Sequence, residues 1–323
     1  MRRSPLMITA AVLVLTVMSV VVVRFVRTYE TPASAGRTPA AATPTATPAP
    51  GVGVPGSEPS GPPAGNPGIA GGDDPAQQAR FEYAAQLIHT TPGHLGIVVR
   101  DRRTGLDWRN GETDRPARAS STIKLAMAAN LLERGRSGEI KLDSKARKDI
   151  ADMLDTPSDT AANALWDRYG KEAFVPWFQQ QYGMTNLAFP PGLPHNWDQL
   201  TGTPDDLIHL MSYVLDRADP GDRDYFVSEL RRPGAAQHWG IWAAGPSNLP
   251  GNTNGWALET DDNVKHWVTH SVGFAGPDSR YAIAIMYDQA PGGTVTTGVH
   301  TVSDIVATIF GAPTPAKITE PPT

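Results

Sequence analysis

Residues 119–132 read Ala-Ser-Ser-Thr-Ile-Lys-Leu-Ala-Met-Ala-Ala-Asn-Leu-Leu. Beyond Ile123, every position of this stretch except Lys124 and Asn130 is apolar, and strong helix formers dominate. The stretch therefore predicts a buried helix over residues 121–133. A lone lysine inside such a helix is costly unless it is paired or used chemically.

Ser121 and Lys124 form a Ser-x-x-Lys pattern at the start of this helix. Because residues three apart lie on one helix face, the lysine amine can take the proton of the serine hydroxyl. The free N–H groups of the helix N-terminus can stabilise a developing oxyanion. We therefore interpret Ser121 as the candidate nucleophile and Lys124 as its base. The alternative interpretation makes Ser120 or Ser121 a helix cap and Lys124 a solvated residue.

Strands are predicted at both ends of the globular region, with helices between them. The strands are expected over 94–101, 106–109, 253–258, 266–274 and 280–287, and further helices over 76–89, 159–169, 203–216 and 299–310. This order predicts an α+β fold, an α/β sandwich in which the terminal strands meet in one antiparallel sheet flanked by helices.

The first 75 residues of the chain have a different composition. Residues 6–23 are apolar except for Thr9, Thr16 and Ser19, which is long enough for a helix to span a membrane. Residues 28–75 are rich in Pro, Ala, Thr and Gly and predict a disordered tether. We expect a membrane anchor over 1–27, a linker over 28–75, a domain over 76–312 and a disordered tail over 313–323. The alternatives are a signal peptide cleaved near residues 33–35 and a cytoplasmic linker.

Composition excludes several classes of function. The formal net charge is −5, which argues against a nucleic-acid-binding surface. The sequence contains no cysteine, which excludes disulfides, cysteine-type zinc sites, a thiol nucleophile and a lipid-modified cysteine. The eight histidines show no tight metal-ligand spacing. We expect no cofactor, no metal and a monomer.

Residues 119–132 resemble the nucleophile helix of class A β-lactamases and related penicillin-binding enzymes. Two further stretches match that family in order: Ser158-Asp159-Thr160 resembles its Ser-Asp-Asn motif, and Thr253-Asn254-Gly255 resembles its Lys-Thr-Gly motif. The resemblance covers residues 76–312 and extends to actinobacterial cell-surface proteins. It implies an extracytoplasmic serine hydrolase with Ser121, Lys124 and Ser158 as catalytic residues. It also implies substrate binding by Asp159, Thr253, Asn254 and Gly255.

The chain departs from the family's pattern in three places. In the second motif, an alignment through the following helix puts Pro157, rather than Ser158, on the serine position. In the third motif Thr253 stands where the family has a carboxylate-binding lysine, a loss for which Arg231 or Arg232 could compensate. The family's deacylating glutamate is also missing, since only Glu172 and Asp198 lie between 171 and 203, and a structural or solvated role is favoured for Asp198.

These departures leave three hypotheses for function. In the first, Ser121 is acylated by a β-lactam or a D-alanyl peptide, a small-molecule or peptidoglycan-peptide substrate, and the adduct is hydrolysed poorly. In the second, the domain has lost turnover and binds the cell wall or a protein partner. In the third, it is an esterase acting on substrates other than β-lactams, which would explain the missing lysine.

Overall fold

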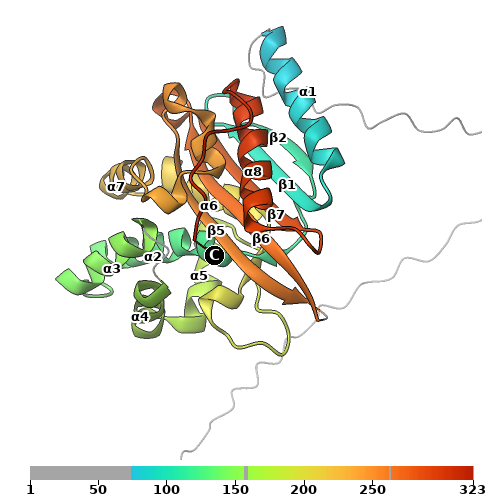
Figure 1. The fold of residues 1–323 in the computed structure, drawn as a ribbon. Helices are drawn as coiled ribbons and strands as arrows, with labels where there is room; N and C mark the ends of the chain where they lie inside the picture. Colours follow the sequence, from blue (N-terminus) through green and yellow to red (C-terminus); the bar gives the residue numbers. More distant parts are fainter. Residues whose placement is uncertain (1–73, 156–158, 262, 323) are drawn as a thin grey trace, which may run out of the picture. The chain divides into compact units, whose positions relative to one another are not determined.

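The strand predictions are confirmed as one five-stranded antiparallel sheet. The computed structural model describes residues 74–155, 159–261 and 263–322. The predicted anchor, and nearly all of the predicted linker, lie outside these residues. The strands are β1 (Gly93–Asp101), β2 (Leu106–Gly111), β5 (Gly251–Asp261), β6 (Val264–Ala275) and β7 (Tyr281–Gln289), in the order β2-β1-β7-β6-β5. The N-terminal hairpin thus pairs with the last strand of the chain, as Figure 1 shows.

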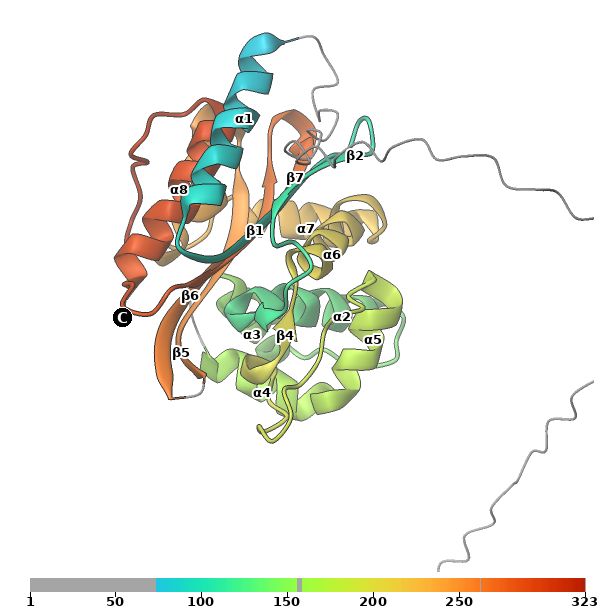
Figure 2. The same ribbon diagram turned by 90° about the vertical axis from the view of Figure 1, so that its right-hand side faces the viewer.

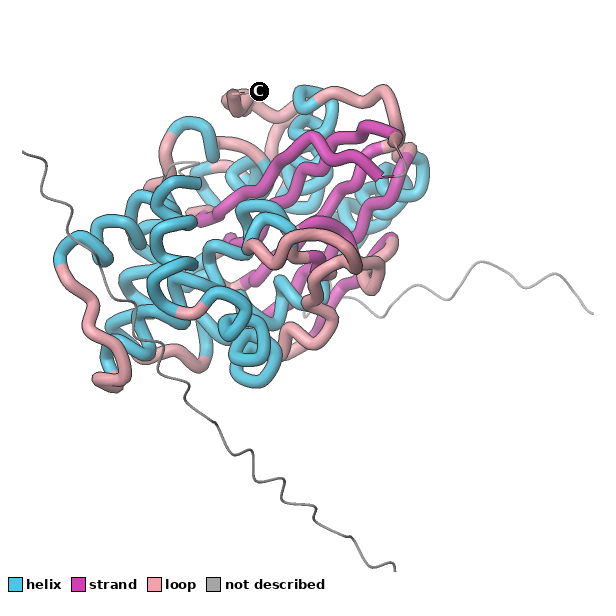
Figure 3. The backbone as a smooth tube through the Cα atoms, turned by 90° about the horizontal axis from the view of Figure 1, so that it is seen from below, coloured by secondary structure: helices cyan, strands magenta, loops and turns pink. Residues whose placement is uncertain are grey.

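Helices cover both faces of this sheet, and Figure 2 shows the three layers. One face carries α1 (Pro75–Thr90) and α8 (Val295–Phe310). The other carries the remaining described helices, which are α2 (Lys124–Arg136), α3 (Ser144–Asp155), α4 (Asp159–Tyr169), α5 (Phe174–Tyr182), α6 (Pro204–Asp216) and α7 (Pro220–Leu230). Figure 3 shows the strands side by side, with helices beyond the ends of the sheet.

The alternation of side chains along the strands divides the core into two parts. On β7, Ile283 and Ile285 pack toward α1 and α8, whereas Ala282 and Ala284 pack toward the larger helical layer. This is the two-residue period of a strand that is buried on both faces. The small alanines leave space for the helices of the larger layer to approach the sheet closely.

The chain enters α2 through a tighter turn than the sequence predicted. Residues Ser120–Ile123 form a 3₁₀ turn, η1, and the α-helix begins at Lys124. In 3₁₀ geometry residues i and i+3 eclipse one another, so Ser121 and Lys124 still lie on one side. The alternative that made Ser120 or Ser121 a helix cap is wrong, since neither the 3₁₀ turn nor α2 has a side-chain cap.

The segment after α8 packs along the domain, whereas the sequence predicted a disordered tail there. The backbone N–H of Ala316 donates to Asp304 Oδ1 at 2.6 Å, and Trp256 Nε1 donates to the carbonyl oxygen of Pro322 at 3.1 Å. These bonds tie residues 313–322 to α8 and to β5. Within the described residues, no helix is both long and apolar enough to cross a membrane.

Candidate active site

Ser121 is the partly exposed residue of a turn that is otherwise buried. Ser120, Thr122 and Ile123 are buried on either side of it. The turn follows β3 (Ala117–Arg118), which pairs with β4 (Thr201–Gly202). Ser120 has a φ of +49°, a left-handed conformation that is rare for a residue other than glycine. Such local strain is characteristic of functional turns.

Lys124 lies inside the protein rather than in solvent. Its side chain is 1% exposed, its Nζ lies 2.8 Å from Asp159 Oδ1, and the Trp197 ring centroid is 4.8 Å from Nζ. The alternative that made Lys124 a solvated residue is therefore wrong. Burial lowers the pKa of Lys124, and Asp159 opposes that shift without cancelling it. The residue thus has the electrostatic setting of a lysine that can act as a base.

Gly255 brings strand β5 against the backbone of the nucleophile turn. A Cβ atom at this position would lie 2.9 Å from the backbone nitrogen of Ser121 and 3.0 Å from that of Thr122. Only glycine permits such a close approach. The predicted first and third motifs are therefore adjacent in space.

Asp159 and Thr253 complete the neighbourhood of these residues. Asp159 is the first residue of α4, and its side chain is 66% exposed although it reaches the buried Lys124. Thr253 is buried and shares a strand face with Gly255, because alternate residues of a strand point the same way. Ser158, predicted to relay a proton, lies outside the described residues, as does Pro157.

Comparisons with known proteins agree with this geometry. The model of the "Beta-lactamase enzyme family" matches residues 80–156. The putative lipoprotein LppW of Mycobacterium tuberculosis is 28% identical over 254 residues, which cover 74% of this chain and 78% of that protein. The solved structure of PBP-A has a TM-score of 0.60 at 19% identity, covering 72% of this chain and 95% of that one. A β-lactamase from Burkholderia phymatum has a TM-score of 0.59 at 17% identity, covering 73% and 98%.

The chain has the fold of the class A β-lactamases and penicillin-binding proteins and is distantly similar to the mycobacterial LppW proteins. The side chain of Asn254, which the β-lactamase resemblance assigned to substrate binding, forms its hydrogen bonds within the protein. Its side-chain nitrogen donates to the carbonyl oxygens of Gln237 and Trp239 at 3.1 and 3.2 Å, and its Oδ1 accepts a bond from Asn252 Nδ2 at 3.0 Å. The amide that the sequence assigned to substrate binding thus joins β5 to the segment of residues 237–239.

The two arginines proposed to replace the β-lactamase lysine bind other groups. Arg231 Nη2 donates to Ser279 Oγ at 3.4 Å. Arg232 lies at the exposed end of α7, where its Nη2 donates to Ser228 Oγ at 2.7 Å. Neither contact leads toward Thr253, so the structure gives no support for compensation by these residues.

Sequence reasoning missed an ion pair beside the β-lactamase-like site. Arg118 ends β3, donates to Gln199 Oε1 and lies 4.0 Å from Glu259 Oε2, measured from Nη2. Both side chains of this pair are largely buried. Burial raises the pKa of Glu259, and Arg118 opposes that shift. No local sequence pattern predicts this contact, because it joins positions 141 residues apart in the sequence.

Trp197 fills the space that faces Lys124. It begins η3 (Trp197–Gln199), is buried, and donates from Nε1 to Asn163 Oδ1 at 2.7 Å. The two acids considered in place of the β-lactamase glutamate, Glu172 and Asp198, are exposed. On the side of Lys124 away from Asp159, an aromatic ring therefore lies beside the lysine, and neither of these two carboxylates does.

His270 is a further buried residue that the sequence did not single out. It is fully buried on β6, opposite Gly255 in the strand register, and its Nε2 lies 2.8 Å from the carbonyl oxygen of Arg118. The backbone N–H of Tyr287 donates to its Nδ1 at 3.1 Å. These bonds fit a neutral ring with the proton on Nε2, which ties the strand before Ser121 to the sheet. Within the described residues, no group of three His, Asp or Glu side chains could hold a metal ion.

Proposed function

We propose that the domain is an acyl-serine enzyme in which Ser121 attacks a β-lactam or a D-alanyl peptide and keeps the acyl group for a long time. The observation that carries the proposal is Lys124, a buried lysine with a lowered pKa three residues after the partly exposed Ser121. In its neutral form the lysine amine takes the proton of Ser121 Oγ as the new ester bond forms. Ser158 would return a proton to the leaving group.

Backbone N–H groups are available for the oxyanion. The backbone N–H of Asn254 donates to Gln237 Oε1 at 2.7 Å and so points away from β6. Because alternate residues of an antiparallel strand direct their N–H groups to the same side, the N–H of Trp256 also points away from β6. This side of β5, which no further strand covers among the described residues, lies beside the backbone nitrogen of Ser121, because Gly255 packs against that nitrogen. The two N–H groups could bind one oxygen, an arrangement whose single donors contribute about 3–4 kcal/mol in enzymes.

Trp197 supports slow deacylation. Hydrolysis of the acyl-enzyme needs a water molecule and a base beside the ester. The Trp197 ring occupies the space next to Lys124, and its N–H is already bonded to Asn163. The solved structures similar to this chain include an acyl-enzyme complex of a PBP-A variant with penicillin G.

Two observations keep alternative functions in view. The contact between Lys124 and Asp159 favours the charged lysine, which is the state expected of a domain that binds the cell wall or a protein partner without turnover. The uncharged Thr253 favours an esterase whose substrates carry no carboxylate, because a neutral hydrogen bond contributes about 1 kcal/mol and a charge-assisted one roughly 1.5–3.

We also propose an envelope location with the domain outside the cytoplasm. The similar mycobacterial proteins are named putative lipoproteins. This sequence has no cysteine to carry a lipid, so residues 6–23 would serve as the anchor instead. Protease accessibility of the domain in intact cells, compared with lysed cells, tests this orientation.

The experiment that tests acylation is labelling of the full-length protein with a fluorescent penicillin. We expect one covalent adduct per chain that persists for hours and is lost in Ser121→Ala. The matched control is Ser247→Ala, which removes the hydroxyl of an exposed serine. A folded protein that forms no adduct at any concentration contradicts penicillin reactivity, and hydrolysis of p-nitrophenyl acetate by that same protein would favour the esterase.

A further inference from the structure

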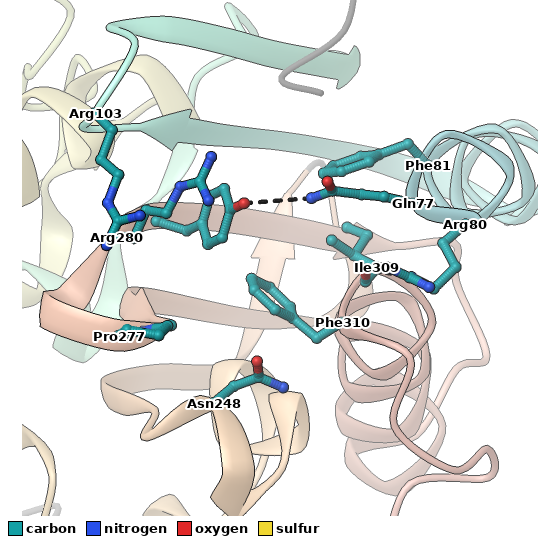
Figure 4. A pocket seen from close by; sticks show the side chains of 11 residues that line it. Gln77, Arg80, Phe81, Arg103, Asn248, Pro277, Arg280, Ile309 and Phe310 are labelled. Carbon is teal, nitrogen blue, oxygen red and sulfur yellow. Dashed lines mark hydrogen bonds between the residues drawn. The ribbon is translucent and has the colours of Figure 1, made fainter. Parts of the chain in front are cut away.

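A cavity lies on the face of the sheet opposite the nucleophile helix. It has a volume of about 250 Å³ and is enclosed by the start of α1, the end of α8 and the turn between β6 and β7. Figure 4 shows the residues that line it. Ser121 and α2 belong to the other helical layer, so this cavity is separate from the proposed site of acylation.

Aromatic rings form the walls of the cavity. Phe81 projects from α1, Tyr281 from the start of β7 and Phe310 from the end of α8. The ring centroids of Tyr281 and Phe310 are 5.6 Å apart with an interplanar angle of 71°. Gln77 Nε2 donates to the hydroxyl oxygen of Tyr281 at 3.3 Å, which fixes that ring. Walls of this kind accept a flat apolar molecule.

Three arginine side chains give the wall of the cavity its positive charge. Arg280 is neutralised by the buried Asp101, whose Oδ2 lies 2.6 Å from Nη2. Arg103 has a much weaker partner, since its Nη2 lies 3.9 Å from a carboxylate oxygen of Asp278, a side chain that is 94% exposed. Arg80 donates from Nε to the carbonyl oxygen of Ile309 at 3.3 Å.

The lining of the cavity is therefore cationic. Among the described residues, Arg80 contacts no carboxylate, and no acidic side chain lines the cavity. Two positive charges thus border a partly apolar space without a strong counter-charge. An isolated cationic cleft of this kind concentrates anions. Arginine is also the residue best suited to hold a carboxylate by two parallel hydrogen bonds.

We propose that this cavity binds a small amphiphilic anion, namely a flat aromatic carboxylate whose ring packs against Tyr281 and Phe310 on the side of these rings that faces the cavity. Arg103 and Arg80 both attract its carboxylate. The volume is below the range of about 300–1,000 Å³ that is typical of sites for drug-sized ligands, so the ligand is a small aromatic acid rather than a peptide or a nucleotide. Binding requires neither Ser121 nor acylation.

Calorimetric titration of the full-length protein tests the proposal, with 2-naphthoate as the probe and 2-naphthamide as its uncharged counterpart. We expect one site for 2-naphthoate, at least about tenfold weaker binding of the amide, and weaker binding at high salt. Arg80→Gln and Arg103→Gln should each raise the Kd about three- to tenfold. The matched control is Arg147→Gln, an exposed arginine on α3, which should leave the Kd unchanged.

Thermal melting of each variant shows whether it is folded before it is titrated. Equal affinities for the acid and the amide would overturn the proposal, as would 2-naphthoate binding that both cavity variants leave unchanged. Absence of binding at about 5 mM probe to the folded wild-type protein would also overturn it. The Ser121→Ala variant should bind 2-naphthoate as the wild type does, so the result does not depend on whether the protein is acylated.

Discussion

Lys124 and Asp159 form an ion pair, with 2.8 Å between Nζ and Oδ1, in which one side chain is buried and the other is largely exposed. The lysine side chain is 1% exposed and the aspartate side chain is 66% exposed. Solvent can therefore stabilise the carboxylate if the pair separates, but it cannot stabilise the ammonium in its present place. The pair consequently sets the protonation state of the proposed base, and it is the first target for mutation.

Replacement of the aspartate should shift the pH profile of acylation. In Asp159→Asn the contact that raises the pKa of Lys124 is gone, while the burial that lowers it remains. The fraction of neutral lysine at pH 7 therefore rises, and the rising limb of the profile moves to lower pH. The measurement is the rate of adduct formation with labelled penicillin between pH 5 and 10. Asp167→Asn, an exposed acid on the same helix, is the control. An unchanged profile would show that Asp159 does not tune the base.

Removal of the lysine should stabilise the fold and abolish the reaction. Replacement of a whole buried ion pair by apolar side chains is often neutral or stabilising by about 1–4 kcal/mol, and in Lys124→Met only the lysine half of this pair is buried. The carboxylate left behind is mostly in water. We expect a higher midpoint of thermal unfolding and no penicillin adduct. Marked destabilisation of this variant would indicate that the ion pair, rather than chemistry, is the reason for the lysine.

A methyl group at Gly255 should disturb the nucleophile turn. The Cβ of Gly255→Ala would lie 2.9 Å from the Ser121 nitrogen and 3.0 Å from the Thr122 nitrogen. Overpacking of this kind typically costs about 1–3 kcal/mol. We expect acylation to slow at least about tenfold, measured with the protein well below its melting temperature. Gly221→Ala, whose methyl group would meet only Asp219 Oδ1 at 3.3 Å, should leave acylation unchanged.

Opening the space beside Lys124 should shorten the life of the adduct. Trp197→Ala removes the ring that faces the lysine and the bond to Asn163, and such a truncation costs about 3–5 kcal/mol of stability. Water could then reach the ester, so loss of label after removal of free penicillin should be several-fold faster. Trp197→Phe keeps most of the ring and should retain a long-lived adduct. Equal lifetimes in both variants and the wild type would exclude Trp197 as the barrier.

Acid should destabilise the protein through His270. Burial lowers the pKa of this residue to about 4, from about 6.5 in an unfolded chain. Between these values the unfolded state binds more protons, so the free energy of unfolding falls as pH decreases from about 6.5 to 4 and levels off below. The expected loss is on the order of 3 kcal/mol. Denaturant titration of wild type and His270→Gln checks it, because the variant should lack this part of the pH dependence.

The part of the fold that could be predicted depends on local patterns. The strand Tyr281–Gln289 and the helix Asp159–Tyr169 were located to within about two residues, because their apolar residues and end signals are contained within the segment. Helices α3, α5 and α7 were not located individually. On α3 only Ala146, Ile150, Met153 and Leu154 are buried, among charged residues. This short apolar stripe is enough to stabilise the helix because it packs against neighbouring helices. Those neighbours come from other parts of the chain, so the sequence of the segment alone does not predict the helix.

The sequence predicted those parts of the candidate site in which the type of one residue and its immediate neighbours in the chain determine its surroundings. A single lysine in an apolar helix indicated burial and pairing, and both are observed for Lys124. The roles of Trp197 and Arg118 depend on partners 73 and 141 positions away, respectively, so no spacing rule could identify them. The motif position of Asn254 alone does not predict its contacts. Its side chain donates hydrogen bonds to the carbonyl oxygens of Gln237 and Trp239, and neither partner is apparent from the motif.

The bond from Trp256 to the carbonyl oxygen of Pro322 gives the last described residues influence over the proposed site. Trp256 follows Gly255 directly, and the same terminal segment is fastened to α8 through Ala316. A protease that cut between these two attachments would leave every proposed catalytic residue in the chain. It would nevertheless free the side chain of Trp256 from Pro322 while β5 stays paired with β6, so carboxy-terminal trimming would change the surroundings of the residue next to Gly255 without removing a catalytic group.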